Sequence, residues 1–198
     1  MSLYYQEQEE KTMSYTFFFR PQSPFSNWNQ NGETFTLYGQ TFNCGEQAMM
    51  WCKAWLFGDM EKASEILASE YPKEQKALGR EVGGYDEVMW VAMRMQVVYM
   101  VLKAKFTQSD YYKNVLLETG TSKMVEASPY DKIYGIGLNE EKARMVPENQ
   151  WPGKNLLGKL MTKLKKEMIL GEPHKHFELQ EILDLGVEAK VKEQVSVR

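Results

Sequence analysis

The chain has 198 residues, of which 43% are hydrophobic and 26% charged, and 24 basic against 27 acidic residues give a formal net charge of −3. This balance favours one globular domain with its own core over a fibrous or disordered chain, and it provides no overall field that would attract nucleic acid, although a local basic groove stays compatible with it. The longest apolar run, Val97 to Leu102, is far shorter than the roughly 20 residues of a transmembrane helix, and the polar start has no secretory segment, so we predict a cytoplasmic protein with no membrane partner.

The first part of the chain predicts a few short strands. Residues 1–14 are polar and acidic without apolar periodicity, which indicates a flexible arm. The aromatic run from Tyr15 to Phe19 is typical of a strand, and it is followed by two prolines that would end it. Apolar and polar residues mostly alternate over 35–42 around Gly39, which predicts a small hairpin.

From residue 43 onward the apolar residues recur every three or four positions, as they do in helices. Asn43 and Glu46 resemble a capping box at the start of a helix that ends at Gly58. Residues 122–137 are turn-rich and predicted to be irregular, so that backbone groups there are free for a ligand. Further helices are predicted over 59–69, 72–78, 86–106 and 109–118, and from about Pro152 to Leu170.

The predicted fold is therefore mainly α, with a few short β-strands near the N-terminus. The helix over 86–106 is apolar on nearly every side, which places it at the centre of the core. We expect a compact domain over residues 15–170. Residues 171–198 differ in composition and are predicted to be an appendage outside it, with a weak alternation that would allow strand pairing.

Cysteine and histidine chemistry is not expected to define a site. Cys44 and Cys52 are the only cysteines, and on one helix they would lie about 12 Å apart, beyond the ~7 Å limit between the Cα atoms of a disulfide, so both are predicted to be free thiols. His174 and His176 lack accompanying ligands at metal spacing, so no metal is predicted. The chain contains no glycine-rich nucleotide motif and no cofactor is predicted, which leaves carboxylates and lysine for catalysis.

Glu46 and Lys53 are the first candidate pair. They are seven residues apart, two helical turns, and should project from one face as the wall of a site. The alternative is that Glu46 completes the helix cap while Lys53 extends to water. A second pair, Trp90 and Arg94, places a guanidinium beside an indole, where Arg94 could meet a ligand phosphate or an internal carboxylate such as Asp86 or Glu87.

Two loops supply further candidates. Asp131 lies with Tyr134, Gly135 and Gly137 in a turn-rich segment, where a ring could stack and a ligand could approach the backbone; the alternative is an Asx turn that only shapes the loop. The segment from Trp151 through Gly153, Lys154 and Asn155 opens a helix whose free amides could hold a phosphate. Arg80 is a candidate for phosphate contact or for an ordinary salt bridge.

Five stretches of the chain form a set of motifs: SPFSNW (Ser23–Trp28), FNCGEQAMMWCKA (Phe42–Ala54), ALGREV (Ala77–Val82), VEASPYDKIYGIG (Val125–Gly137) and WPGKNLLGKLM (Trp151–Met161). In this order they resemble the NADAR (NAD and ADP-ribose associated) family, also called YbiA-like, and together they cover roughly residues 15–170. Trp28 and Tyr134 stand where many members have Phe and Trp, which preserves an aromatic ring, and Trp90 aligns with a tryptophan that the family uses at its site.

The resemblance implies a compact helical domain with N-glycosidase activity on ribose-linked substrates. In the family these are ADP-ribose attached to guanine, which makes ADP-ribosylated DNA or RNA a candidate partner, or ribosylamino intermediates of riboflavin synthesis. We expect removal of ADP-ribose from guanine, with Glu46 or Asp131 acting at C1′ of the ribose and Lys53 polarising the sugar or base, or attacking as a nucleophile. The competing hypotheses are the riboflavin intermediate as substrate and a non-catalytic module that binds ADP-ribose or an NAD-derived ligand.

Overall fold

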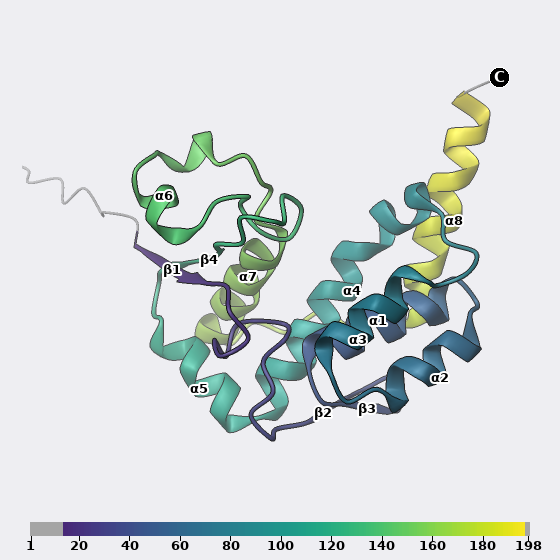
Figure 1. Cartoon of the computed structure of the whole chain (residues 1–198), viewed down its shortest axis with the longest axis horizontal. Coiled ribbons are helices and arrows are strands. Elements are labelled where there is room, and N and C mark those ends of the chain that lie inside the picture. The colour runs from purple at the N-terminus through teal and green to yellow at the C-terminus, as the bar shows by residue number, and fades with distance from the viewer. Residues whose placement is uncertain (1–13, 197–198) are drawn as a thin grey trace, which may run out of the picture.

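The structure is a computed structural model, and it describes residues 14–196; of the predicted N-terminal arm, only Ser14 falls within this range. Figure 1 shows a mainly helical molecule with a few short strands, which confirms the predicted fold class. The elements are β1 (Tyr15–Phe18), β2 (Phe35–Leu37), β3 (Gln40–Phe42), α1 (Gly45–Leu56), α2 (Met60–Ala68), α3 (Pro72–Arg80), α4 (Glu87–Gln108), α5 (Asp110–Glu118), β4 (Lys123–Glu126), α6 (Glu140–Arg144), a 3-10 turn (Glu148–Gln150), α7 (Leu156–Leu170) and α8 (Leu179–Ser196).

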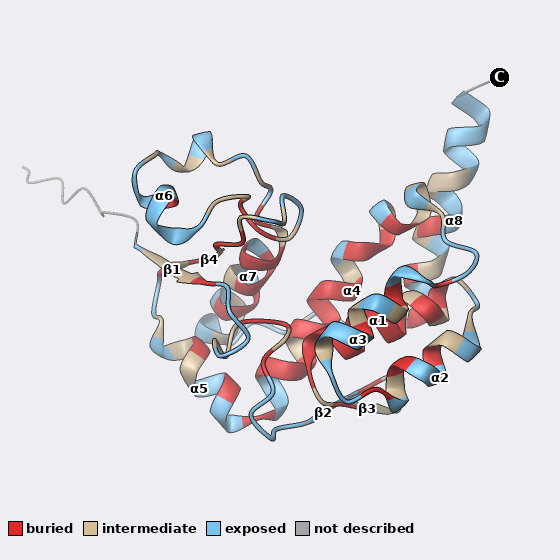
Figure 2. Ribbon diagram, in the orientation of Figure 1, coloured by how far each residue is buried: buried red, intermediate tan, exposed pale blue. Residues whose placement is uncertain are grey.

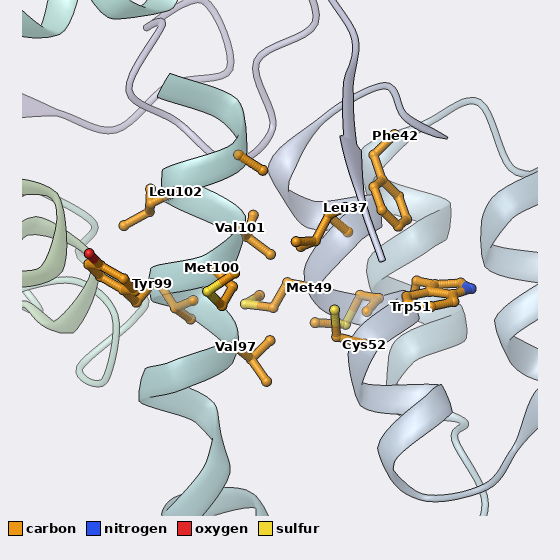
Figure 3. Packing of buried hydrophobic residues seen from close by; sticks show 14 of the residues in the cluster. Leu37, Phe42, Met49, Trp51, Cys52, Val97, Tyr99, Met100, Val101 and Leu102 are labelled. Carbon is orange, nitrogen blue, oxygen red and sulfur yellow. The ribbon is translucent and has the colours of Figure 1, made fainter. Parts of the chain in front are cut away.

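Helix α4 lies at the centre of the core, as its sequence predicts. It begins after Asp86, whose carboxylate accepts a hydrogen bond from the Met89 amide and so caps the helix. Its neighbours are α1, α5, α7 and α8 (Figure 2). Figure 3 shows the side chains of Val97, Met100 and Val101 facing Met49 and Cys52 of α1. Flexible methionines fill the irregular space between the two helices.

The strands form two separate pairs. Strands β2 and β3 make the predicted antiparallel hairpin, with Phe35 opposite Phe42. Strand β1 pairs in parallel with β4, with Tyr15 opposite Lys123 and Phe18 opposite Glu126. Residues 123–126 were predicted to be irregular, so β4 corrects that interpretation. Because the strands are parallel, the residues that follow them, 19 and 127, leave the sheet at the same end. This end of the sheet forms one wall of the site.

The residues after Gly171 do not form the strand pairing that their weak alternation would allow. They form α8, which packs along α4 while its C-terminal end extends beyond the body (Figure 1). Leu179 and Ile182 lie in the same core cluster as α4, and Gly186 is buried against Met93. Leu179, Ile182 and Gly186 are spaced by three and four residues and so share one face of the helix. The prediction of strand pairing rested instead on the alternation in residues 186–198.

This packing gives a stability prediction. Ile182 is fully buried, so Ile182→Ala should lower the free energy of unfolding by about 2–5 kcal/mol, the usual cost of such a truncation in a core. Val195 on the same helix is 70% exposed, and Val195→Ala should change stability by less than about 0.5 kcal/mol. Urea unfolding of the full chain measures both. Equal, small effects would show that α8 contributes nothing to the core.

Cys44 and Cys52 are both buried free thiols, as predicted. Within residues 14–196, every helix is too short or too polar to cross a membrane.

Candidate active site

A cavity of about 920 Å³ lies between the start of α1, helix α3 and the loops that follow β1 and β4. Seven of the predicted site residues line it. Besides Lys53, four cations at its wall, of which only Arg80 was predicted, give it a positive rim: Arg20, Lys76, Arg80 and Lys132. The predicted residues that the cavity brings together are Trp28, Glu46, Lys53, Arg80, Trp90, Asp131 and Tyr134.

Glu46 faces the cavity because another residue caps α1. The N-cap is Cys44, whose sulfur accepts a hydrogen bond from the Gln47 amide, so the predicted capping box of Asn43 and Glu46 is wrong. Gln47 instead accepts a hydrogen bond from the Asn43 amide. Because Glu46 takes no part in the cap, its carboxylate can accept a hydrogen bond of 3.0 Å from the indole nitrogen of Trp28.

The environment of Glu46 is costly for a carboxylate. Its side chain is only 3% exposed, and its Oε1 atom is buried without a hydrogen-bond partner among the described residues. Burial raises the pKa of Glu46, while the positive charge of Lys76 and the Trp28 hydrogen bond oppose that rise. A buried acceptor with no protein partner is a point where a ligand or a water molecule can supply the donor.

Lys53 lies on the same face of α1 and lines the same cavity, as its spacing from Glu46 predicts. Its Nζ donates a hydrogen bond of 2.6 Å to the carbonyl of Gly79 on α3 and stands 4.3 Å from the ring centre of Tyr85. Burial lowers the pKa of Lys53. A second aromatic ring, that of Trp90, lies 6.0 Å from Nζ.

Arg94 does not make the contact that was predicted for it. The cation beside the Trp90 indole is Lys53, and the described residues show neither a stacked indole nor an ion pair for the Arg94 guanidinium. Asp86, one of the carboxylates considered for it, pairs instead with Lys190 of α8 at 2.9 Å. Arg94 is buried but does not line the cavity.

Asp131 forms the Asx turn that was considered for it, and it also lines the cavity. In this turn one carboxylate oxygen accepts hydrogen bonds from the amides of Ile133 and Tyr134, which shapes the loop. Gly135 and Gly137 serve the loop itself. A Cβ on Gly135 would lie 2.9 Å from the Asp131 carbonyl, and Gly137 has φ +72, so close chain packing rather than ligand approach requires both glycines.

The start of α7 is not the anion site that was predicted. The helix begins at Leu156, and the amides of residues 153–157 all donate to carbonyls of residues 132–136, which leaves them unavailable to a phosphate. Gly153 is required because a Cβ there would lie 2.3 Å from the Gly135 carbonyl. Lys154 is exposed and, with Trp151, lies outside the lining of the cavity.

Trp151 and Asn155 instead hold the fold around the site. The Trp151 ring packs against Tyr15 at 5.4 Å between ring centres, and its indole nitrogen donates to the Ala143 carbonyl. The Asn155 side chain bridges β4: it accepts a hydrogen bond from the Glu126 amide and donates one to the Met124 carbonyl. Asn155 therefore positions the end of β4, where a further acid lies.

Glu126 is the site residue that the sequence analysis missed. It lines the cavity at the end of β4, and its Oε2 atom is buried with no hydrogen-bond partner among the described residues. Burial, followed by the negative charge of Asp131, raises the pKa of Glu126 to about 8. The residue lies within the VEASPYDKIYGIG stretch, but only the parallel pairing of β4 shows that it faces the cavity.

A second missed residue holds the loop that carries Trp28. Lys105 of α4 is 1% exposed, and its Nζ donates hydrogen bonds of 2.8 Å to the carbonyls of both Pro24 and Ser26. Burial lowers the pKa of Lys105 to about 7. Lys105 thus holds the Ser23–Trp28 loop against α4. The Glu46 amide holds the same loop against α1 by donating a hydrogen bond to the Asn27 carbonyl.

A large cavity that holds buried acids with raised pKa values beside lysine and arginine defines a candidate enzyme active site. The chain belongs to the NADAR domain family, whose model matches residues 4–169. Helix α8 therefore lies beyond the matched residues although it packs on the core.

Individual relatives agree with this assignment. N-glycosidase R617 of Acanthamoeba polyphaga mimivirus is 43% identical over 137 residues, which are 69% of this chain and 78% of that protein. A chloroplastic riboflavin biosynthesis protein, PYRR of Zea mays, is 32% identical over 109 residues, 53% of this chain and 16% of that protein. The NMR structure of the E. coli protein YbiA has the same fold, with a TM-score of 0.64 and 24% identity, covering 83% of this chain and 92% of that one.

Proposed function

We propose that the chain is an N-glycosidase that releases ADP-ribose from guanine by hydrolysing the bond between the ribose C1′ and the base. The class of reaction, hydrolysis of an N-glycosyl bond, follows from membership of the NADAR family and from relatives named N-glycosidases. The observation that carries the proposal further is the pair of buried carboxylates, Glu46 and Glu126, whose unpartnered oxygens lie in one cavity with a cationic rim.

The two carboxylates suit different roles. The transition state for loss of the base carries positive charge at C1′, which an ionised carboxylate stabilises, while the departing base needs a proton. Glu46 receives a hydrogen bond from Trp28 and lies near the charge of Lys76, both of which favour its ionised form. Burial and the negative charge of Asp131 both raise the pKa of Glu126, to about 8, so this carboxyl group keeps its proton at neutral pH. Burial raises the pKa of both carboxyl groups, and the hydrogen bond from Trp28, which only Glu46 receives, is the difference by which we assign Glu46 as base and Glu126 as acid.

In the proposed reaction the bond between C1′ and the base nitrogen breaks as Glu126 transfers its proton toward the base. Glu46 stabilises the charge on the sugar and then accepts a proton from the water that adds to C1′. Lys53 polarises the sugar or base, Asp131 holds the loop and keeps Glu126 protonated, and the cationic rim meets the pyrophosphate. The aromatic rings of Trp28, Trp90 and Tyr134 line the space for the base and sugar.

The size and charge of the cavity favour ADP-ribose over a smaller metabolite. About 920 Å³ is near the upper end of usual ligand pockets and suits a dinucleotide-sized molecule. The four cations of the rim match a doubly charged pyrophosphate. A ribosylamino pyrimidine phosphate is the alternative that the family resemblance implies, and one relative is named a riboflavin biosynthesis protein. Such a phosphate would leave part of the cavity and of its charge unused.

A direct comparison of substrates tests the proposal. The full chain is incubated separately with ADP-ribosylated guanosine and with a ribosylamino pyrimidine phosphate, and free ADP-ribose or free base is measured by chromatography. We expect release of ADP-ribose with a kcat/KM at least tenfold above that for the pyrimidine. The reverse preference would assign the metabolite, and tight retention of ADP-ribose without turnover would assign a binding module.

A further inference from the structure

A second cavity, of about 520 Å³, continues from the first and is not used by the proposed reaction. The two share Phe19, Arg20 and Tyr130, so these residues stand on the border between them. Phe19 and Arg20 directly follow β1, and Tyr130 lies in the loop that follows β4. The parallel pairing of the two strands brings these loops together at one edge.

The border carries two exposed aromatic rings. Tyr130 is 88% exposed and Phe19 is 36% exposed. Their ring centres lie 6.3 Å apart with the planes tilted by 48°, so neither ring covers the face of the other. Exposed large rings beside a cavity leave apolar area in water that a flat ligand would cover.

Two cations flank this border, and Asp131 stands between Tyr130 and Lys132 in the chain. Arg20 lines both cavities and Lys132 lines the first one close to Tyr130. The acid of the second cavity, Glu140, is neutralised by an ion pair of 2.7 Å with Arg144. Neither Arg20 nor Lys132 forms an ion pair among the described residues. Open aromatic rings flanked by such cations form the pattern by which proteins hold single-stranded nucleic acid, stacking on bases while cations meet phosphates.

We propose that Phe19 and Tyr130 form a stacking platform for the nucleobase next to the modified guanine of a single-stranded nucleic acid, with Arg20 and Lys132 at the connecting phosphates. The inference rests on the proposed function and narrows its substrate from a free nucleoside to a strand. A modified guanine must leave a duplex before the bond between the base and its ADP-ribose can enter the cavity. A single strand is therefore the form that fits. A free nucleoside would fill the first cavity and leave the platform empty.

The test compares two substrates that differ only in the neighbouring nucleotides: ADP-ribosylated deoxyguanosine, and a single-stranded oligodeoxynucleotide with one ADP-ribosylated guanine. Tyr130→Ala should lower kcat/KM on the oligonucleotide roughly 5- to 100-fold more than on the nucleoside, the effect of losing one base stack. Tyr130→Phe keeps the ring and should restore the oligonucleotide rate. Tyr111→Ala removes a tyrosine that is 46% exposed on α5 and lines neither cavity, and it should change neither rate.

If Tyr130→Ala lowered kcat/KM equally on both substrates, or did not lower it on the oligonucleotide, the proposed platform would be wrong. If the wild-type chain hydrolyses neither substrate, the proposed function fails, and the platform is then decided by binding alone. In that case fluorescence anisotropy with an unmodified single-stranded oligodeoxynucleotide at low salt should give a Kd that Tyr130→Ala raises roughly 5- to 100-fold. The same Kd for both proteins, or no binding by the wild type, would exclude it.

Discussion

Glu46→Gln is expected to lower kcat for release of ADP-ribose from guanine by about 10³-fold, with little change in KM. The amide has the shape of the carboxylate and can still accept the hydrogen bond from Trp28, so the local structure should persist. It cannot carry the negative charge that stabilises the sugar cation, nor accept a proton from water. Single-turnover measurements with ADP-ribosylated guanosine separate this chemical effect from product release.

Two controls make the result specific to the cavity. Glu118→Gln changes an exposed acid at the end of α5 and should retain full kcat. Thermal unfolding of Glu46→Gln should show a Tm no lower than that of the wild type, because the substitution removes a buried carboxylate whose pKa burial raises. A variant with wild-type kcat would exclude Glu46 from the reaction, and Asp131 would then be the carboxylate at C1′.

The parts of the fold that the sequence predicted are those that local interactions determine. Helices α2, α4 and α5 begin directly after Asp59, Asp86 and Ser109, whose side chains accept hydrogen bonds from amides of the first turn. These signals lie within a few residues of the element that they define. The seven-residue spacing of Glu46 and Lys53 is local in the same sense, and the structure places both at one cavity.

The parts that it did not predict depend on contacts between distant residues. Strand β4 exists because β1 pairs with it across more than 100 residues of intervening chain, and a four-residue segment carries too weak a pattern to indicate this alone. Without β4, nothing distinguishes Glu126 from an exposed loop acid. In the same way, the amides before α7 resemble a free helix N-terminus until the loop of residues 132–136 is seen to occupy them.

The pH dependence of catalysis is the second large effect, and it separates Glu126 from Glu46. With a pKa of about 8 against an ordinary value of 4.5, Glu126 holds its proton at neutral pH and loses it as the pH rises through about 8. If it protonates the departing base, kcat/KM should fall about tenfold per pH unit above that value. Glu126→Gln should lower the rate at pH 7 by about 10²-fold or more and abolish this decline, whereas a decline that persists in the variant would assign the proton to another group.

The same raised pKa predicts that Glu126→Gln stabilises the fold although it lowers activity. Between pH 4.5 and about 8 the folded chain keeps a proton on Glu126 that the unfolded chain releases, so its contribution to stability is fully present below pH 4.5 and is lost as the pH rises through about 8. Glutamine remains neutral throughout. The Tm of Glu126→Gln should therefore increasingly exceed that of the wild type as the pH is raised from about 5 to 8. A less active but more stable variant would show that the fold tolerates this buried acid for its chemistry, because a purely structural acid would lose stability on substitution.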